Sequence, residues 1–262
     1  MARINLKKFF KGTYLGLLLA FLYLPIVVMI VLSFNQSKSR AKWGGFSFKW
    51  YLKLLERGEI LDALRLTLVI AVLATVVATV LGTLAAIGIH AMKKRPAGLI
   101  MNISYLPMTT PDIVTGVSLM LMFVFLRIPL GFSTMLMAHI AFDTPYVLFS
   151  VMPKLKQMDV NLYEAALDLG CTPLRAIYKV ILPQIMPGVV TGALLAFTMS
   201  LDDFVISYFT SSATEKNLSM VVYSAARRGI EPSIYALSTV MFLVVLVLLL
   251  IINKRSSLEN VS

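Results

Sequence analysis

Residues 161–183 read NLYEAALDLGCTPLRAIYKVILP, a stretch that carries start and stop signals for two short helices. Asn161 followed three positions later by Glu164 is a variant of the capping box, so a helix is expected to begin there. Gly170 can end this helix, because glycine adopts a left-handed backbone conformation at little cost. The first half of the stretch therefore predicts one short, well-capped helix.

The second half of the stretch predicts another short helix. Thr172 can cap it with Pro173 at its first position, and Pro183 marks the start of the next apolar segment. Ala165 and Ala166 on the first helix present almost no side chain, so the surface of another protein can approach closely there. Together the two helices predict a rigid, bent hairpin that is suited to docking a partner.

The chain on both sides of this hairpin is strongly apolar. Hydrophobic residues make up 58% of the 262 residues, charged residues make up 14%, and the mean hydropathy is +0.84. Apolar runs of about 18 residues or more recur, and each can cross a hydrocarbon core of roughly 30 Å as a helix. The predicted spans are residues 12–34, 66–89, 99–126, 132–152, 184–209 and 234–252. The sequence thus predicts an all-α polytopic membrane protein with six transmembrane helices, one transmembrane domain over residues 1–262, and a loop over residues 153–183.

Proline and glycine indicate how some of these spans are shaped. Pro107 and Pro111 each remove a helical hydrogen bond, so the third span is expected to bend there. Gly188-x-x-x-Gly192 in the fifth span, like Gly12-x-x-x-Gly16 in the first, allows two helices to cross closely.

Both chain termini are predicted to be cytoplasmic, because cytoplasmic flanks of membrane spans are usually the more basic. The first apolar run is interpreted as an anchor, since no small-x-small cleavage site follows it. The first loop, which would lie outside, is also basic. Its segment around Trp50 and Leu54 is expected to form an amphipathic helix whose Lys and Arg face lipid headgroups. The basic residues on the inner side are Arg3, Lys7, Lys8, Lys11, Lys93, Lys94, Arg95, Lys254 and Arg255.

Several classes of function have no support in the sequence. None of the 14 glycines precedes a lysine, so no nucleotide-binding P-loop is present. Cys171 is the only cysteine, and no Gly-x-Ser-x-Gly or His-Glu-x-x-His motif occurs. No catalytic or metal site is therefore expected. The net charge of +11 is explained by membrane flanks, and without an aromatic-basic module no nucleic-acid partner is expected.

The hairpin resembles a loop that is typical of ABC importer permeases. Glu164-Ala165-Ala166, then Gly170, then Val180-Ile181-Leu182-Pro183 follow the family pattern, and only Val180 departs, where isoleucine is usual. Nearly the whole chain is similar to the permeases of spermidine/putrescine importers. The segments that carry this similarity are 23–26, 33–35, 45–46, 49–51, 111–114 and 197–203.

This resemblance implies a type I ABC importer permease fold in a bacterial inner membrane, with cytoplasmic coupling helices that dock on an ATPase. It implies that polyamines are moved inward, that the chain itself binds no cofactor, and that a partner ATPase uses ATP and Mg²⁺. The implied partners are a second permease subunit, two ATPase copies, an extracytoplasmic substrate-binding protein and membrane lipids. The coupling residues that it implies are Glu164, Ala165, Ala166, Gly170, Leu182 and Pro183.

Four aspartates lie within the predicted spans, where each ionised carboxylate costs roughly 2.5 to 3.5 kcal/mol on insertion scales. Such residues are expected to face protein or a hydrated route. For an elongated cation, carboxylates supply compensating charge and aromatic rings offer cation-π faces. The predicted substrate pathway comprises Asp112, Asp143, Asp202 and Asp203 with the aromatic residues Tyr105, Tyr146, Phe204 and Tyr208.

Structural alternatives exist for the same aspartates. Asp112 can cap a half-helix, and His139 lies four positions before Asp143, where a local hydrogen bond suffices. The acids of the fifth span can also pair with Arg127, or with Arg227 and Arg228 in the fifth loop.

Two other transport functions remain open from the sequence. One is an ABC importer permease for another solute, such as iron or thiamine. The second is a secondary transporter driven by ion gradients, with the intramembrane aspartates as proton or sodium sites. A membrane-embedded enzyme is disfavoured, because the sequence offers no catalytic constellation.

Overall fold

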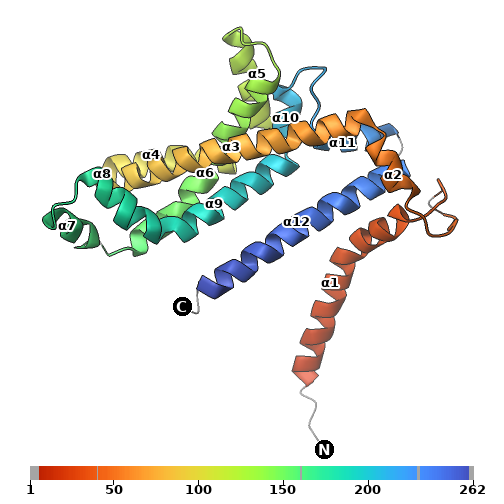
Figure 1. Cartoon of the computed structure of the whole chain (residues 1–262), viewed down its shortest axis with the longest axis horizontal. Helices are drawn as coiled ribbons and strands as arrows, with labels where there is room; N and C mark the ends of the chain where they lie inside the picture. The colour runs from red at the N-terminus through yellow and green to blue at the C-terminus, as the bar shows by residue number, and fades with distance from the viewer. Residues whose placement is uncertain (1–5, 40, 160, 229–230, 260–262) are drawn as a thin grey trace, which may run out of the picture. The chain divides into compact units, whose positions relative to one another are not determined.

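The computed structural model of the chain is all-helical over the residues that it describes, apart from one isolated bridge between Asn35 and Phe46 (Figure 1). The backbone is described for residues 6–39, 41–159, 161–228 and 231–259, and the side chains for residues 12–39, 41–159, 161–227 and 231–247. The helices are α1 (Leu6–Ser33), α2 (Lys49–Leu55), α3 (Gly58–Ala91), α4 (Lys94–Thr109), α5 (Asp112–Phe125), α6 (Phe132–Gln157), α7 (Asn161–Asp168), α8 (Pro173–Ala176), the π-helix η1 (Ile177–Ile181), α9 (Leu182–Asp202), α10 (Val205–Thr210), α11 (Leu218–Arg228) and α12 (Pro232–Glu259).

The chain forms two compact units. The first comprises Met1–Leu61 and Val222–Ser262, and the second comprises Asp62–Val221. In the first unit α12 packs against α1 and α2. The second unit holds the predicted hairpin and all four intramembrane aspartates, so it contains the candidate site.

The loop that follows α1 in the first unit is built around Asn35. The Asn35 amide donates to the carbonyls of Ser39 and Lys42, and its side-chain oxygen accepts the backbone N–H groups of Ser37 and Gly44. This loop leads into α2, whose Trp50 is buried, as expected for an amphipathic helix. Helix α3 begins at Gly58, eight positions before the predicted start of the second span at residue 66.

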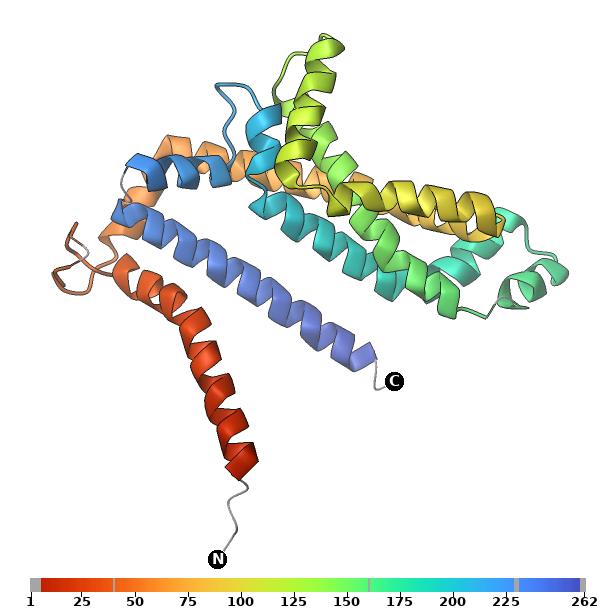
Figure 2. The same cartoon turned by 180° about the vertical axis from the view of Figure 1, so that it is seen from behind.

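Helix α6 is the central element of the second unit, with α3 and α9 packed against it (Figures 1 and 2). A Cβ built at Gly192 would lie 2.9 Å from the Cα of Val147, and one built at Gly188 would lie 2.9 Å from the carbonyl oxygen of Ser150. The close crossing predicted for Gly188 and Gly192 is therefore confirmed. Gly82 of α3 approaches the same turn of α6, with its added Cβ 2.7 Å from Val147 Cβ. Small residues let three backbones meet at one level.

Four helices among the described residues are long and apolar enough to cross a membrane, and a fifth span results if α4 and α5 count as one broken helix. The four are Gly12–Ser33, Gly58–Ala91, Phe132–Gln157 and the continuous helical segment Pro173–Asp202. The sixth predicted span corresponds to α12, whose described apolar part, Pro232–Val247, is shorter than a span requires. The all-helical membrane fold is confirmed, whereas the count of six is not fully established by the described residues.

The predicted bend in the third span is a sharp break. The chain bends by 105° between α4 and α5. Thr110 has an extended backbone with ψ 136°, as expected for a residue before a proline, and Pro111 precedes the first residue of α5. The break gives α5 its own direction, and α5 then packs on α10 through Gly116, which lies close to the backbone of Val205 and Ile206.

The fifth span was predicted to continue to residue 209, but α9 ends at Asp202. The cause is Asp203, whose Oδ1 accepts the backbone N–H of Ile206 at 3.1 Å and whose Oδ2 accepts that of Ser207 at 2.7 Å. These two bonds satisfy amides at the start of a helix, so they stabilise a new start and α10 begins there.

Candidate functional site

The first half of the hairpin folds as its sequence predicts. Gly170 has φ +85°, which confirms the left-handed end of α7. Its N–H donates to the carbonyl of Leu167 at 2.8 Å, and the N–H of Cys171 donates to the carbonyl of Ala166 at 3.0 Å. This pair of bonds is the Schellman motif, and it fixes the direction in which the chain leaves α7.

The capping of α7 differs from the prediction. Asn161 begins the helix, but the carboxylate of Asp159 accepts both the backbone N–H of Asn161 at 3.0 Å and its side-chain amide at 2.9 Å. Asp159 thus accepts the backbone N–H of Asn161 that a capping box would direct to Glu164. Thr172 holds the predicted position before Pro173 at the start of α8, although its side chain makes no capping hydrogen bond.

The π-helix η1 connects the hairpin to α9. It follows α8 directly and continues into α9, so the hairpin and the fifth span form one helical rod from Pro173 to Asp202. A π-helix has a wider, less favourable turn than an α-helix and is found mostly at functional positions. A displacement of the hairpin would therefore reach α9 through a continuous helical element.

The hairpin presents an apolar outer surface. Leu169 is 87% exposed, Leu174 is 81% exposed and Tyr178 is 71% exposed. Glu164 and Ala165 are exposed as well, whereas Ala166 is buried against the rest of the hairpin. A partner predicted to approach both Ala165 and Ala166 can therefore reach only Ala165.

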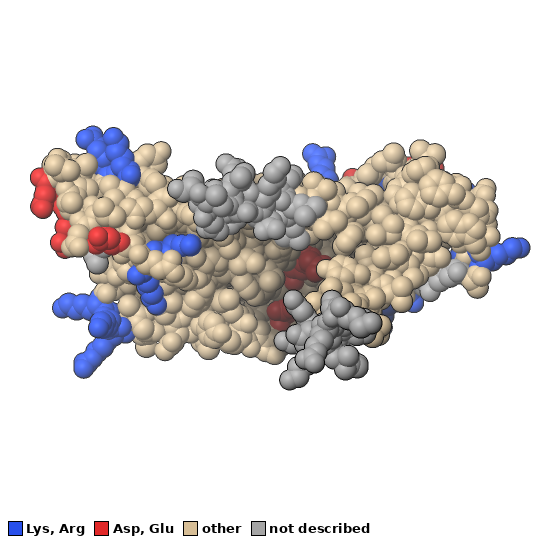
Figure 3. Space-filling view, turned by 90° about the horizontal axis from the view of Figure 1, so that it is seen from below, with Lys and Arg blue, Asp and Glu red and all other residues tan. Residues whose placement is uncertain are grey.

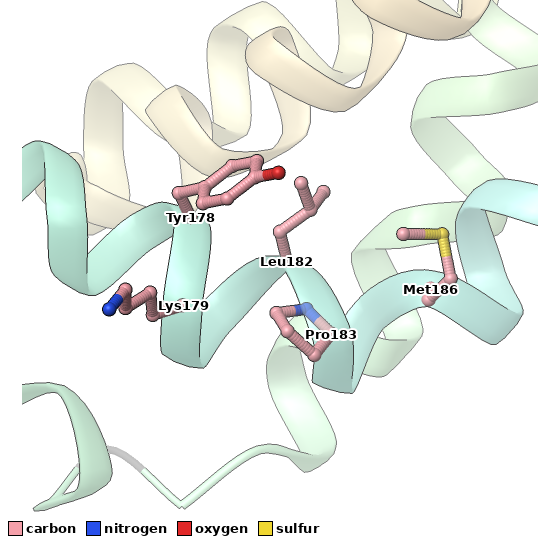
Figure 4. Close-up of a pocket in the computed structure, with 5 residues that line it drawn as sticks. All are labelled: Tyr178, Lys179, Leu182, Pro183 and Met186. Carbon is pink, nitrogen blue, oxygen red and sulfur yellow. The ribbon is translucent and has the colours of Figure 1, made fainter.

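A groove runs along η1 and the first turns of α9. Tyr178, Lys179, Leu182, Pro183 and Met186 line it, and Figure 4 shows these side chains spaced along successive turns. Charged side chains of both signs gather at the end of the second unit that carries the hairpin, while the helices beyond it are mostly tan (Figure 3). Such an exposed apolar surface with a charged surround is typical of a protein–protein contact.

A polar cluster lies inside the second unit, centred on His139 of α6. The Nδ1 atom of His139 lies 2.6 Å from the hydroxyl of Ser200 in α9, and Nε2 lies 2.9 Å from the hydroxyl of Ser207 in α10. Nε2 also lies 3.5 Å from Oδ2 of Asp203, and Asn217 donates to the carbonyl of Asp203 at 2.8 Å. The imidazole therefore ties the break between α9 and α10 to the central helix.

The two neighbouring aspartates of the fifth span have different surroundings. The side chain of Asp203 is only 8% exposed and is occupied by the cap of α10. Asp202 is exposed, and Ser219 donates to its backbone carbonyl, at 3.4 Å, rather than to its carboxylate. Of the pair, Asp202 is the carboxylate that is available to a ligand.

The third-span aspartate, Asp112, is exposed at the start of α5. Pro111, not Asp112, holds the cap position, and no side chain caps this helix start. Tyr146 of α6 is half-buried and lies three positions after Asp143 on the same helix.

The aromatic residues of the predicted pathway are only partly grouped. Phe204 and Tyr208 are neighbours, with ring centroids 5.5 Å apart, at the start of α10. Tyr146 contacts Phe142 on α6, and Tyr105 of α4 contacts Phe149 farther along that helix.

Asp143 is fully buried, and neither of its carboxylate oxygens has a hydrogen-bond partner. The local bond to His139 that the sequence allowed is absent, because both nitrogens of that ring bond serines. Ion pairing was the other structural alternative. Arg127 makes no ion pair with these aspartates within the described residues, Arg227 stacks over the ring of Tyr223, and the side chain of Arg228 lies outside the described part.

Sequence reasoning missed the serine partners of His139 and the role of Asn217. Ser200 and Ser207 lie 61 and 68 positions from His139, and nothing in the local pattern connects them. One signal was available, since a histidine within an apolar run must find polar partners somewhere in the fold.

The chain is similar to known transport proteins. Residues 78–254 match the family described as "Binding-protein-dependent transport system inner membrane component". Over 240 residues the chain is 36% identical to the spermidine/putrescine transport system permease protein PotC of Escherichia coli (strain K12), covering 92% of this chain and 91% of that protein. Over 226 residues it is 39% identical to the putrescine transport system permease protein PotI of the same strain, covering 84% and 80%.

Solved structures share the fold at low sequence identity. A bacterial ABC transporter involved in the import of the acidic polysaccharide alginate matches with a TM-score of 0.79 and 14% identity, covering 97% of this chain and 98% of that one. A bacterial alginate ABC transporter in complex with an alginate pentasaccharide-bound periplasmic protein matches with a TM-score of 0.73 and 17% identity, covering 97% and 95%. These likenesses confirm the predicted permease fold.

Proposed function

Because this chain belongs to the family of binding-protein-dependent transport system inner membrane components, we propose that it is the membrane permease subunit of an ATP-driven importer of polyamines. The observation that carries the substrate is its similarity over most of its length to two permeases named for spermidine and putrescine. The exposed acids Asp112 and Asp202 support this choice, since an elongated cation needs carboxylates along its route.

The importer is an assembly, and this chain supplies one of its membrane subunits. The other parts are a second permease subunit, two copies of a cytoplasmic ATPase that binds ATP and Mg²⁺, and an extracytoplasmic substrate-binding protein. The chain spans the inner membrane with both termini in the cytoplasm. Lys93, in the short connection between α3 and α4, and Lys94 and Arg95, at the start of α4, support this orientation.

The hairpin is the contact with the ATPase. Its exposed leucines and Tyr178, together with Glu164 and Ala165, offer a surface that a groove on another protein can cover. Because the segment from Pro173 to Asp202 is one continuous helix, movement of the hairpin also moves α9, whose far end carries Asp202. Closure of the ATPase is in this way converted into a change at the substrate pathway.

The pathway itself is lined by Asp112 and Asp202 with Tyr146, Phe204 and Tyr208. Asp203 and His139 hold the break between α9 and α10, so they position Asp202 without contacting the substrate. Positioning groups fixed by packing and hydrogen bonds are what a selective site requires.

Uptake measurements in the native host test the proposed function. Deletion of the gene should abolish binding-protein-dependent uptake of labelled spermidine and putrescine, and restoration of the gene should recover it. Normal polyamine uptake with loss of thiamine or iron uptake would identify another substrate. An affinity-tagged chain should copurify an ATPase. Uptake that persists without ATP but stops when the ion gradient is removed would refute the ATP-driven mechanism.

A further inference from the structure

The buried polar side-chain atoms without partners lie on two helices of the second unit, α3 and α6. Among the described residues, the buried side-chain oxygens that lack a hydrogen bond are both carboxylate oxygens of Asp143 and the hydroxyl oxygens of Thr75, Thr79 and Thr83. The three threonines follow one another at intervals of one helical turn on α3. Folded proteins leave few such groups unsatisfied, so a cluster of them requires an explanation.

The threonine stripe lies on a helix that packs against α6, which carries Asp143. Gly82, next to Thr83, lies against the carbonyl oxygen of Thr144 and the side chain of Val147. Residues spaced by three or four positions share a helix face, so this stripe lies on the side of α3 that packs against α6. The unsatisfied hydroxyls therefore lie on the face of α3 that meets the helix carrying Asp143.

The surrounding polar groups are satisfied, so poor packing does not explain the cluster. His139, one turn before Asp143, has both ring nitrogens bonded, and the hydroxyl of Thr144 donates to the carbonyl of Ile140 at 2.6 Å. Asp203 accepts two backbone N–H groups. Of the two buried carboxyl groups Asp143 and Asp203, only that of Asp143 has no hydrogen-bond donor among the described residues.

What this arrangement lacks is a cation with N–H donors. The free oxygens are two carboxylate acceptors and three hydroxyls that can also accept, and an ammonium group has three donors and no acceptor. An ammonium group beside this carboxyl would supply both a compensating charge and the missing donors, whereas a neutral solute would supply no charge.

We propose that Asp143 is an occluded binding site for one ammonium group of the transported polyamine, with the threonine hydroxyls of α3 as additional acceptors. This inference rests on the proposed function and identifies the part of the ligand that is bound and where. The fully buried carboxylate corresponds to a closed, empty state, and parting of α3 and α6 during transport admits the ammonium group. An unstable empty site is expected where binding must drive a conformational change.

The test compares Asp143→Asn with the parent in the complete importer. The substitution keeps the shape and removes the ionisable group, so the complex should assemble with an unchanged unfolding temperature. Binding-protein-stimulated ATP hydrolysis should persist, whereas the number of polyamine molecules transported per ATP should fall roughly ten-fold or more, because a charge-assisted contact is lost. Thr144→Val is the matched control, since that hydroxyl bonds only its own helix and both readouts should stay unchanged.

The outcomes separate this inference from the proposed function. Normal polyamine transport per ATP by Asp143→Asn would overturn the ammonium site and leave the importer function intact. A lowered unfolding temperature with transport reduced only in proportion to the amount of complex would also overturn it, by assigning Asp143 a structural role. Absence of polyamine transport by the parent complex would overturn both.

Discussion

Replacing Gly170 by valine should weaken docking of the ATPase by distorting the hairpin backbone. Gly170 has φ +85°, and a Cβ built on it meets nothing within 4 Å. The substitution therefore introduces no clash, and its whole effect comes from placing an L-residue in the left-handed region. Asparagine tolerates this region far better, so Gly170→Asn is the matched control that adds a side chain without the same strain.

The cost follows from the backbone conformation. An L-residue in the left-handed helical region loses roughly 1 to 2 kcal/mol, and a β-branched residue such as valine is the less tolerated kind. That free energy corresponds to a change of roughly 5- to 30-fold in an equilibrium constant. The chain can relieve it only by giving up the bonds from the N–H groups of Gly170 and Cys171 to the carbonyls of Leu167 and Ala166. The angle between α7 and α8 would then be lost.

Two measurements report on this change. The amount of ATPase that copurifies with the tagged chain, at equal expression, should fall by about the factor above for Gly170→Val, and spermidine uptake should fall with it. Gly170→Asn should remain close to the parent in both. Equal loss in both variants would mean that any side chain at this position obstructs the partner, and unchanged copurification of Gly170→Val would refute the backbone argument.

Three further predictions concern the pathway, the topology and the core. Asp202→Asn should keep the stability of the complex and lower polyamine uptake roughly ten-fold or more. Asp203→Asn weakens the cap of α10, so it should lower the free energy of unfolding by about 1 kcal/mol. Thermal unfolding and uptake of both variants check this, and identical behaviour would contradict the different roles assigned to the two aspartates. A cysteine that replaces Lys42, in a chain without its native cysteine, should react with an impermeant thiol reagent added outside intact cells. Labelling only after the membrane is opened would show that this loop is cytoplasmic and would refute the predicted orientation. Gly192→Ala places a Cβ 2.9 Å from the Cα of Val147, so it should lower the free energy of unfolding by roughly 1 to 3 kcal/mol. In Gly88→Ala the added Cβ meets nothing within 4 Å, so this variant should be as stable as the parent or more stable. Equal melting temperatures would show that α6 and α9 can separate freely.

The local features of this protein were predictable because their causes lie within a few residues. Gly170 ends α7 with a left-handed turn, and Pro111 ends one half-helix and begins another. The apolar runs predicted where helices would form, and small residues at Gly188 and Gly192 predicted a close crossing. Each of these follows from backbone sterics or from the length of an apolar segment.

The environment of each intramembrane acid was not predictable in this way. Four aspartates in apolar runs carry the same local signal, yet the structure buries Asp143, uses Asp203 as a cap and leaves Asp112 and Asp202 exposed. The end of α9 at Asp202 was also missed, because the chain around it is apolar enough to continue as a helix. Only the donors that happen to be nearby decide what a carboxylate does.

The sequence by itself therefore determined an all-helical membrane chain and a hairpin of two short helices, since helix formation and capping depend on neighbours along the chain. Tertiary structure alone decided that His139 meets serines 61 and 68 positions away, and that Asp143 meets no donor at all. Those outcomes depend on which helix faces are brought together, and a hydrogen bond forms only where packing places a donor within about 3 Å of an acceptor.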